Sequence, residues 1–171
     1  MRVVVADTSP LNYLVLIDAV EVLPQLYGHI LVPIEVVREL SSAEGPPEVA
    51  RWIGGGPSWL EVQTIVLNKD PSLAALDPGE RAAIQLALTK NETLLIIDDA
   101  VGRQEATARG IQTVGTLGVL RLAAQKNLVD LPTVLAALLS TNFRVPMSLV
   151  EGLIAEDRER RSVRSLPISP A

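Results

Sequence analysis

Short apolar segments alternate with segments of helical spacing along most of the chain, and this alternation limits the fold more than any other feature. Segments that suit strands cover residues 3–6, 29–32, 60–67, 93–97 and 111–114. Helical patterns lie between and after them, because apolar side chains recur there every three or four residues. Strands that are separated by helices favour a parallel sheet, since parallel neighbours need a crossover connection. The sequence therefore predicts an α/β fold with a central, mostly parallel sheet flanked by helices.

The helical patterns continue beyond the last expected strand, which predicts an α/β domain followed by a helical extension. A length of 171 residues suits one domain with a short addition. We expect the α/β domain to span residues 1–126 and the extension, residues 127–161, to pack on it. Residues 162–171 contain two prolines and are expected to form a loose tail.

The helices expected in the extension carry apolar stripes that exceed what a small sheet core covers. These stripes contain Leu135, Leu138, Leu139, Leu149 and Leu153. Because large exposed apolar patches mark partner surfaces, we expect a homodimer.

Composition excludes several kinds of site. The chain has no cysteine and one histidine, His29, so zinc–thiolate and multi-histidine sites are excluded, and catalysis must rest mainly on carboxylates, hydroxyls, Lys or Arg. A net charge of −5 argues against nonspecific coating of nucleic acid, although 12 of the 15 basic residues are Arg, the better phosphate ligand. No apolar segment is long enough to span a membrane, and Asp7 interrupts the apolar core that a secretory signal needs. We therefore expect a cytoplasmic protein.

Acidic residues directly follow two of the expected strands. Asp7 comes after the first strand, and Asp98 and Asp99 come after the fourth. Ligands of open parallel sheets bind at the carboxyl ends of strands, so these carboxylates would crowd together if the two strands are neighbours. Crowded carboxylates repel each other unless a cation is present, and Mg²⁺ prefers oxygen ligands. We expect a divalent-cation site around one cavity here, with Glu80 in the ring and Glu39 at its rim.

Each acid also has a structural interpretation. The three aspartates stand where Asp commonly caps a helix. Residues 77–80 (DPGE) form a capping-box pattern in which Glu80 is the reciprocal partner. Glu39 shares a helix face with Glu35 and would then be solvated, and His29 is expected at a strand edge. No single acid decides between the interpretations, and only their combination favours a metal site.

Five segments, taken in order, match a known pattern. Residues 3–11 (VVVADTSPL) join a strand to its acid, and residues 33–40 (PIEVVREL) place an acid before a leucine late in a helix. Two further acidic blocks, 76–80 (LDPGE) and 94–99 (LLIIDD), are followed by residues 115–120 (GTLGVL). Together the segments resemble PIN (PilT N-terminal) domains, and the last is similar to one uncharacterised prokaryotic subgroup. The resemblance covers the predicted α/β domain and implies the Rossmann-like, three-layer sandwich of that family.

The resemblance implies that Asp7, Glu39, Glu80 and Asp99 are catalytic acids of a metal site, with Asp98 as a neighbouring ligand. The sequence departs from the family pattern at the third acidic position, where Asp is frequent and Glu80 is one methylene longer.

A second departure lies in the fourth acidic block. Many members carry Thr two residues before the acid, and Ile97 occupies that position here. The loss leaves open which of the two adjacent aspartates is the inner ligand. Thr8, Ser9 or Thr116 would have to supply the missing hydroxyl.

The resemblance implies a metal-dependent endoribonuclease that uses Mg²⁺ or Mn²⁺. Its RNA substrate would be docked by the nearby hydroxyls and by Arg38 and Arg103. The VapC-like kind of PIN domain is the toxin half of a toxin–antitoxin pair, which adds a small antitoxin protein as a partner. The alternative is a PIN-like domain that has lost catalysis and binds nucleic acid or protein. Aspartyl phosphatases, receiver domains and P-loop proteins fit less well. They carry a characteristic acid pattern or a glycine-rich turn after their first strand, and neither follows the expected strand at residues 3–6 here.

Overall fold

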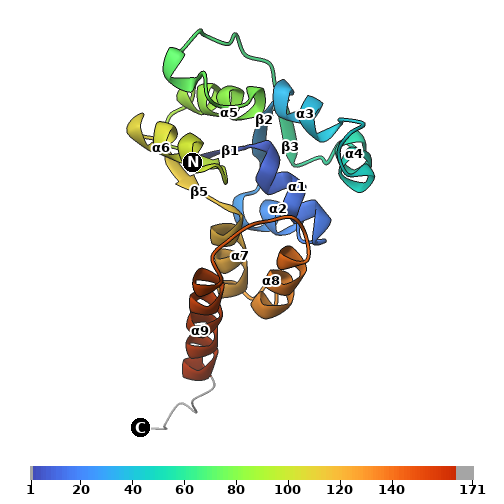
Figure 1. Ribbon diagram of the computed structural model, residues 1–171, viewed down its shortest axis with the longest axis vertical. Coiled ribbons are helices and arrows are strands. Elements are labelled where there is room, and N and C mark those ends of the chain that lie inside the picture. The colour runs from blue at the N-terminus through green and yellow to red at the C-terminus, as the bar shows by residue number, and fades with distance from the viewer. Residues whose placement is uncertain (1, 165–171) are drawn as a thin grey trace.

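The computed structural model describes residues 2–164 and has, over this range, a sheet of five parallel strands in the order β3-β2-β1-β4-β5 (Figure 1). The strands are β1 (Val3–Ala6), β2 (Ile30–Pro33), β3 (Leu60–Gln63), β4 (Thr93–Ile96) and β5 (Gln112–Val114). The helices are α1 (Thr8–Leu16), α2 (Val22–Tyr27), α3 (Ile34–Leu40), α4 (Pro47–Gly54), α5 (Pro78–Leu88), α6 (Ala100–Ala108), α7 (Thr116–Gln125), α8 (Leu131–Leu139), α9 (Met147–Arg164) and the short 3-10 helix η1 (Pro71–Leu73). The predicted α/β class with a parallel sheet is confirmed.

Different helices cover the two faces of the sheet, which gives three layers. Side chains alternate along β1, so Val4 and Ala6 belong to one apolar core and Val5 belongs to the other. The first core takes its apolar side chains from α1 to α4 and from α7 to α9. The second takes them from η1, α5 and α6. Figure 1 shows α5 and α6 on one side of the strands and α7 and α8 on the other, so the predicted three-layer sandwich is confirmed.

Two elements differ from the expectation. The strand expected over residues 60–67 ends at Gln63, because β3 is the edge of the sheet and the chain beyond it leaves its only neighbouring strand, β2. Val66 is accordingly 90% exposed. The helix α2 was not expected, since its six residues include Pro24 and are too short to give a periodic pattern.

The last two helices share the core of the sheet instead of forming one of their own. Leu135 and Leu138 are 1% and 0% exposed, and Leu139 and Leu153 pack against the same core. Most of the apolar stripe behind the homodimer prediction is therefore covered within the chain. Leu149 is the exception, at 49% exposure, and the dimer stays a prediction.

Ion pairs hold the arginine-rich end of α9. Asp157 is 5% exposed and lies 2.6 Å from Arg160 and 2.7 Å from Arg161. Arg161 also lies 3.0 Å from Asp130, which caps the start of α8 through the backbone N–H of Thr133. This network ties α9 to α8.

The helix α9 continues to Arg164, so residues 162–164 are helical where a loose tail was expected, and the rest of that tail lies outside the described residues. None of the helices within residues 2–164 is both long and apolar enough to cross a membrane.

Candidate functional site

The strands that carry the aspartates are neighbours. Ala6 at the end of β1 pairs with Ile96 at the end of β4, and the backbone N–H of Asp7 donates to the Ile96 carbonyl oxygen at 2.9 Å. Asp7 and the pair Asp98–Asp99 therefore follow adjacent strand ends, which is the arrangement that the argument from the sequence required.

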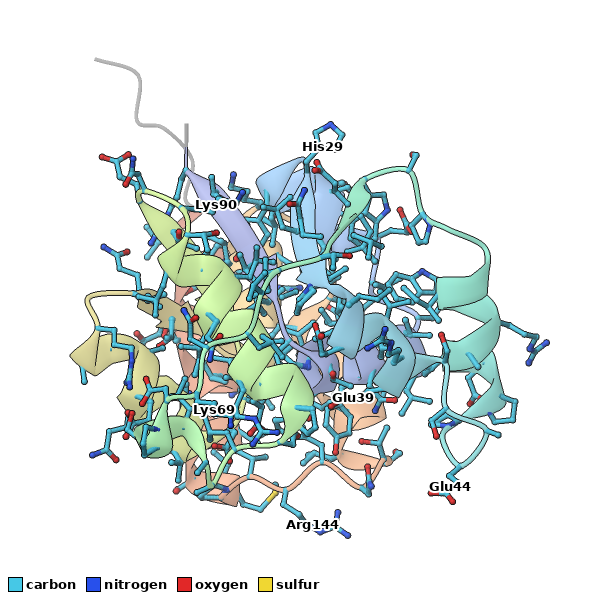
Figure 2. All side chains as sticks on the ribbon, turned by 90° about the horizontal axis from the view of Figure 1, so that it is seen from above. His29, Glu39, Glu44, Lys69, Lys90 and Arg144 are labelled. Carbon is cyan, nitrogen blue, oxygen red and sulfur yellow. The ribbon has the colours of Figure 1, made fainter. Side chains whose placement is uncertain are left out.

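Figure 2 separates the two ends of the sheet. His29 and Lys90, which precede β2 and β4, lie on one side of the view, and Glu39 and Arg144 lie toward the other. His29 is exposed, in keeping with a strand-edge position, and is remote from the acids.

Asp7 is the most deeply buried of the candidate acids. It is 1% exposed, and its Oδ1 has no hydrogen-bond partner among the described residues. Although it stands at the N-cap position of α1, its side chain makes no capping bond. Burial raises the pKa of Asp7 well above its usual value, against the effect of the Thr8 backbone N–H, and the charges of Asp77, Glu80 and Glu39 raise it further. The capping interpretation therefore does not explain Asp7.

Glu80 combines a structural and an electrostatic role. Its backbone N–H donates to Asp77 Oδ1 at 2.8 Å, and its Oε2 accepts from the Asp77 backbone N–H at 3.2 Å, so the expected capping box is present. Burial, followed by the charges of Asp77, Asp99 and Glu39, raises the pKa of Glu80 to about 7. Glu80 thus lies in the same field of negative charge as Asp7.

The two adjacent aspartates have different partners. Asp99 caps α6 through the backbone N–H of Gly102 at 2.7 Å. Asp98 accepts two hydrogen bonds from Thr116, from the backbone N–H at 2.7 Å and from Oγ1 at 2.6 Å, one on each carboxylate oxygen. Burial raises the pKa of Asp98, while these bonds and the charge of Arg103 act to lower it. Asp99 keeps one oxygen unbonded by the described residues and Asp98 keeps none.

Glu39 is held by hydrogen bonds from α1 and α5. Its Oε2 accepts a short hydrogen bond from Thr8 Oγ1, and its Oε1 accepts one from the Gly79 backbone N–H at 2.8 Å. The solvated interpretation of Glu39 therefore does not apply.

The residues expected to contact substrate are placed in several ways. Thr8 and Thr116 bond to acids. Ser9 is partly exposed in the first turn of α1. Arg103 is exposed beside Asp98. Arg38 has a side chain that is 73% exposed, and it lines with Glu39 an open hollow of about 470 Å³.

Sequence reasoning missed a contribution from the connection between α8 and α9. The Tyr13 hydroxyl of α1 donates to Asn142 Oδ1 at 3.0 Å, and its ring meets Phe143 edge-on at 4.9 Å. Burial and the charge of Asp98 raise the pKa of Tyr13, and Arg144 lowers it, so Tyr13 lies between the acidic end and this connection. No motif signals the contact, because its partners are about 130 residues apart in the chain.

The donor chemistry of the site fits a hard cation such as Mg²⁺ or Mn²⁺. In the described part of the chain, Asp7, Glu80 and Asp99 each keep a carboxylate oxygen that accepts no hydrogen bond, and that of Asp7 is buried. No three acidic or histidine side chains within residues 2–164 are arranged around a common point as a bound ion requires. The oxygens suit an ion, and side chains would have to turn to close around it.

The family model described as PIN domain matches residues 3–159. This range includes α8 and most of α9, which the resemblance in the sequence did not reach. Comparison with curated proteins gives no match. PIN domains are generally nucleases and usually use divalent metals. With its parallel sheet, its acids at adjacent strand ends and a match that spans nearly all of the described residues, the chain belongs to the PIN-domain family.

Proposed function

We propose that this protein is an endoribonuclease that uses Mg²⁺ or Mn²⁺ to hydrolyse RNA phosphodiester bonds. The observation that carries the proposal is the buried carboxylate oxygen of Asp7, which has no hydrogen-bond partner among the described residues and lies within the field of Asp77, Glu80 and Glu39. A buried carboxylate that no cation of the described residues neutralises is expected to take up a proton or an ion.

The chain supplies the ion-holding oxygens and the substrate contacts. Asp7, Glu80 and Asp99 would hold the ion, because each has an oxygen that accepts no hydrogen bond from residues 2–164. When bound, a divalent ion lowers the pKa of its water and neutralises charge on the phosphodiester oxygens. Arg38 and Arg103, both exposed, would bind flanking phosphates. Without the ion, the acids repel RNA, so RNA binding should depend on the metal.

In the ion-free protein, the protonation of Glu80 changes near neutral pH. With a pKa of about 7, Glu80 is close to half protonated at neutral pH. A divalent ion held by this carboxylate would displace the proton, so ion binding should weaken as the pH falls below 7.

The biological role that we propose is that of the toxin in a toxin–antitoxin pair, with a small protein as antitoxin and a homodimer as the assembled form. This role rests on the VapC-like resemblance. An adjacent reading frame for a small protein, whose co-expression suppresses RNA cleavage, is the expected finding. The absence of such a suppressor among the neighbouring frames would count against the toxin role and leave the nuclease proposal standing.

One observation favours the alternative of an inactive binding module. The acids within residues 2–164 are not arranged around one point, and Asp98 and Glu39 already have both oxygens bonded. An inactive module would bind RNA equally with and without Mn²⁺ and would not cleave it.

The deciding experiment compares two matched substitutions. We expect Asp7→Asn to abolish Mn²⁺-dependent cleavage of RNA and to remove most of the rise in Tm that Mn²⁺ gives the wild type. The control is Asp18→Asn at an exposed position with a φ of 56°, a conformation that Asn tolerates. We expect the control to cleave at the wild-type rate. Undiminished cleavage by Asp7→Asn would falsify the proposed mechanism.

A further inference from the structure

Glu39 differs from the three proposed ion-holding acids in what its carboxylate contacts. Asp7, Glu80 and Asp99 each keep an oxygen without a hydrogen bond from the described residues, whereas Glu39 bonds Thr8 through Oε2 and Gly79 through Oε1. Both Glu39 bonds join it to other elements of the fold, since Thr8 begins α1 and Gly79 lies in the first turn of α5.

The two partners of Glu39 are sequence neighbours of two candidate ligands. Thr8 directly follows Asp7, and Gly79 directly precedes Glu80. The backbone at each partner therefore carries an ion-holding candidate one residue away. A group that fixes Thr8 against Gly79 also fixes the separation between Asp7 and Glu80.

The local packing is built for this bond. A Cβ at Gly79 would lie 2.8 Å from the carboxyl carbon of Glu39 and 2.9 Å from its Oε1, so the Glu39 carboxylate would have to shift from its present position. Glycine at this position therefore lets the Glu39 carboxylate reach the backbone N–H. The positive end of the α5 dipole adds to the attraction for a carboxylate.

We propose that Glu39 is a positioning residue, which ties Thr8 to Gly79 and so sets the Asp7–Glu80 separation, and that it is not a ligand of the metal ion. The inference rests on the proposed function, because it assigns a role within that site. It departs from the role that the family resemblance implies for Glu39.

Glutamine separates the two roles. A glutamine side chain in place of Glu39 can accept from the Gly79 N–H through Oε1 and donate through Nε2 to the Thr8 hydroxyl, which can act as an acceptor. Glu39→Gln thus keeps the tie and removes the charge, whereas Glu39→Ala removes both. A ligand role needs the charged oxygens, so it would be lost in both variants.

The test measures Mn²⁺ affinity of the free protein by electron paramagnetic resonance, together with kcat and KM for RNA cleavage. For a positioning role, Glu39→Gln should stay within about fivefold of the wild type in Mn²⁺ affinity and in kcat. Glu39→Ala should lose about 10- to 100-fold, as expected when a group that orients a ligand is removed. Any other pattern overturns the inference, including equal losses in both variants and no loss in Glu39→Ala.

Two less disruptive substitutions, both at Thr8, keep the inference testable if Glu39→Ala does not fold. Thr8→Val removes the hydroxyl with little change of shape, and Thr8→Ser restores it. We expect Thr8→Val to weaken Mn²⁺ binding by about tenfold and Thr8→Ser to stay near the wild type. Thr8→Val with wild-type Mn²⁺ affinity would overturn the inference even if Glu39→Ala does not fold.

The outcomes distinguish this inference from the proposed function. A wild-type protein that neither binds Mn²⁺ nor cleaves RNA removes both. An active wild type, with Glu39→Gln as impaired as Glu39→Ala, removes only the positioning role and makes Glu39 a ligand.

Discussion

Two carboxylates of this protein are almost completely removed from water, and their surroundings are opposite. Asp157 on α9 is 5% exposed and lies between Arg160 and Arg161, at 2.6 and 2.7 Å. Asp7 after β1 is 1% exposed, has an oxygen with no hydrogen-bond partner among the described residues, and is surrounded by the charges of other acids.

The difference shows what each carboxylate does for the molecule. Transfer of a charged group into the interior is unfavourable by several kcal/mol, and pairing offsets much of this for Asp157. For Asp7 the described residues supply no paired cation, and only the Thr8 backbone N–H acts against the cost of burial. A buried acid that weakens the folded state is expected where a ligand completes the site, so the proposed function assigns the chemistry to the strand end, whereas the ion pairs of Asp157 lie at the helical end.

Breaking the paired carboxylate should have the largest effect on stability. We expect Asp157→Asn to lower the free energy of unfolding by about 3 kcal/mol, because it leaves Arg160 partly buried without its partner charge. Urea unfolding monitored by circular dichroism measures this. A loss below about 1 kcal/mol would mean that the ion pairs of α9 contribute little, as exposed pairs do.

Substitution of two glycines, one in α5 near the acids and one in α9, compares the packing of the two regions. Gly79→Ala in α5 should lower the free energy of unfolding by about 2 kcal/mol, since the added methyl overlaps the Glu39 carboxylate. Gly152→Ala in α9 has no heavy atom within 4 Å of the new Cβ and should raise it by about 0.5–1 kcal/mol, because Ala is the better helix former. The same urea titration checks both. Equal effects in the two variants would show that Glu39 moves aside freely.

The unpaired carboxylate should respond with the opposite sign to Asp157. In EDTA at pH 8, Asp7→Asn should raise the free energy of unfolding by about 1–2 kcal/mol, because a buried charge among like charges is removed. With saturating Mn²⁺, the wild type should become the more stable of the two. A destabilised Asp7→Asn in EDTA would contradict the comparison.

The pH dependence should give the smallest effect. The pKa of Glu80 is about 7 in the folded protein against an ordinary 4.5, so the folded state binds more protons between these values. The metal-free free energy of unfolding should therefore fall as the pH rises from 4.5 to 7, by about 1 kcal/mol, since partial solvation of Glu80 reduces the full effect. Asp7, whose pKa is also raised, acts in the same direction. Thermal melts of the wild type and Glu80→Gln in EDTA test this, and the substitution should flatten the dependence.

The sequence predicted the features of the fold that have a local cause. The apolar runs predicted the strands. Because Asp7 and Asp98 follow two of these runs, the sequence also predicted the end of the sheet at which the acids lie. The capping box of Asp77 and Glu80 was likewise visible, because its partners are three residues apart. The helix α2 and the end of β3 were not predicted. The helix is too short to give a periodic pattern, and the sequence does not show that β3 is an edge strand.

The partners of each acid were beyond sequence reasoning. Glu39 bonds a backbone N–H that lies 40 residues away, and Asp98 bonds Thr116, which is 18 residues away. Such bonds depend on how helices pack across the sheet, and no spacing rule specifies them. Leu135 and Leu138 are a similar case. The sequence shows that they share one face of a helix, but only the tertiary structure shows that this face packs on the core of the sheet.

The contact of Tyr13 with Asn142 and Phe143 has a consequence for how PIN-domain proteins with this fold diversify. It places the connection between α8 and α9 at the border of the acidic end, although that connection carries no acid itself. Insertions or deletions there would change the surroundings of Tyr13 while every acid stays in place. Under the proposed function, homologues that differ in the length of this connection are expected to differ in which RNA they bind, and exchange of the connection between homologues would test this.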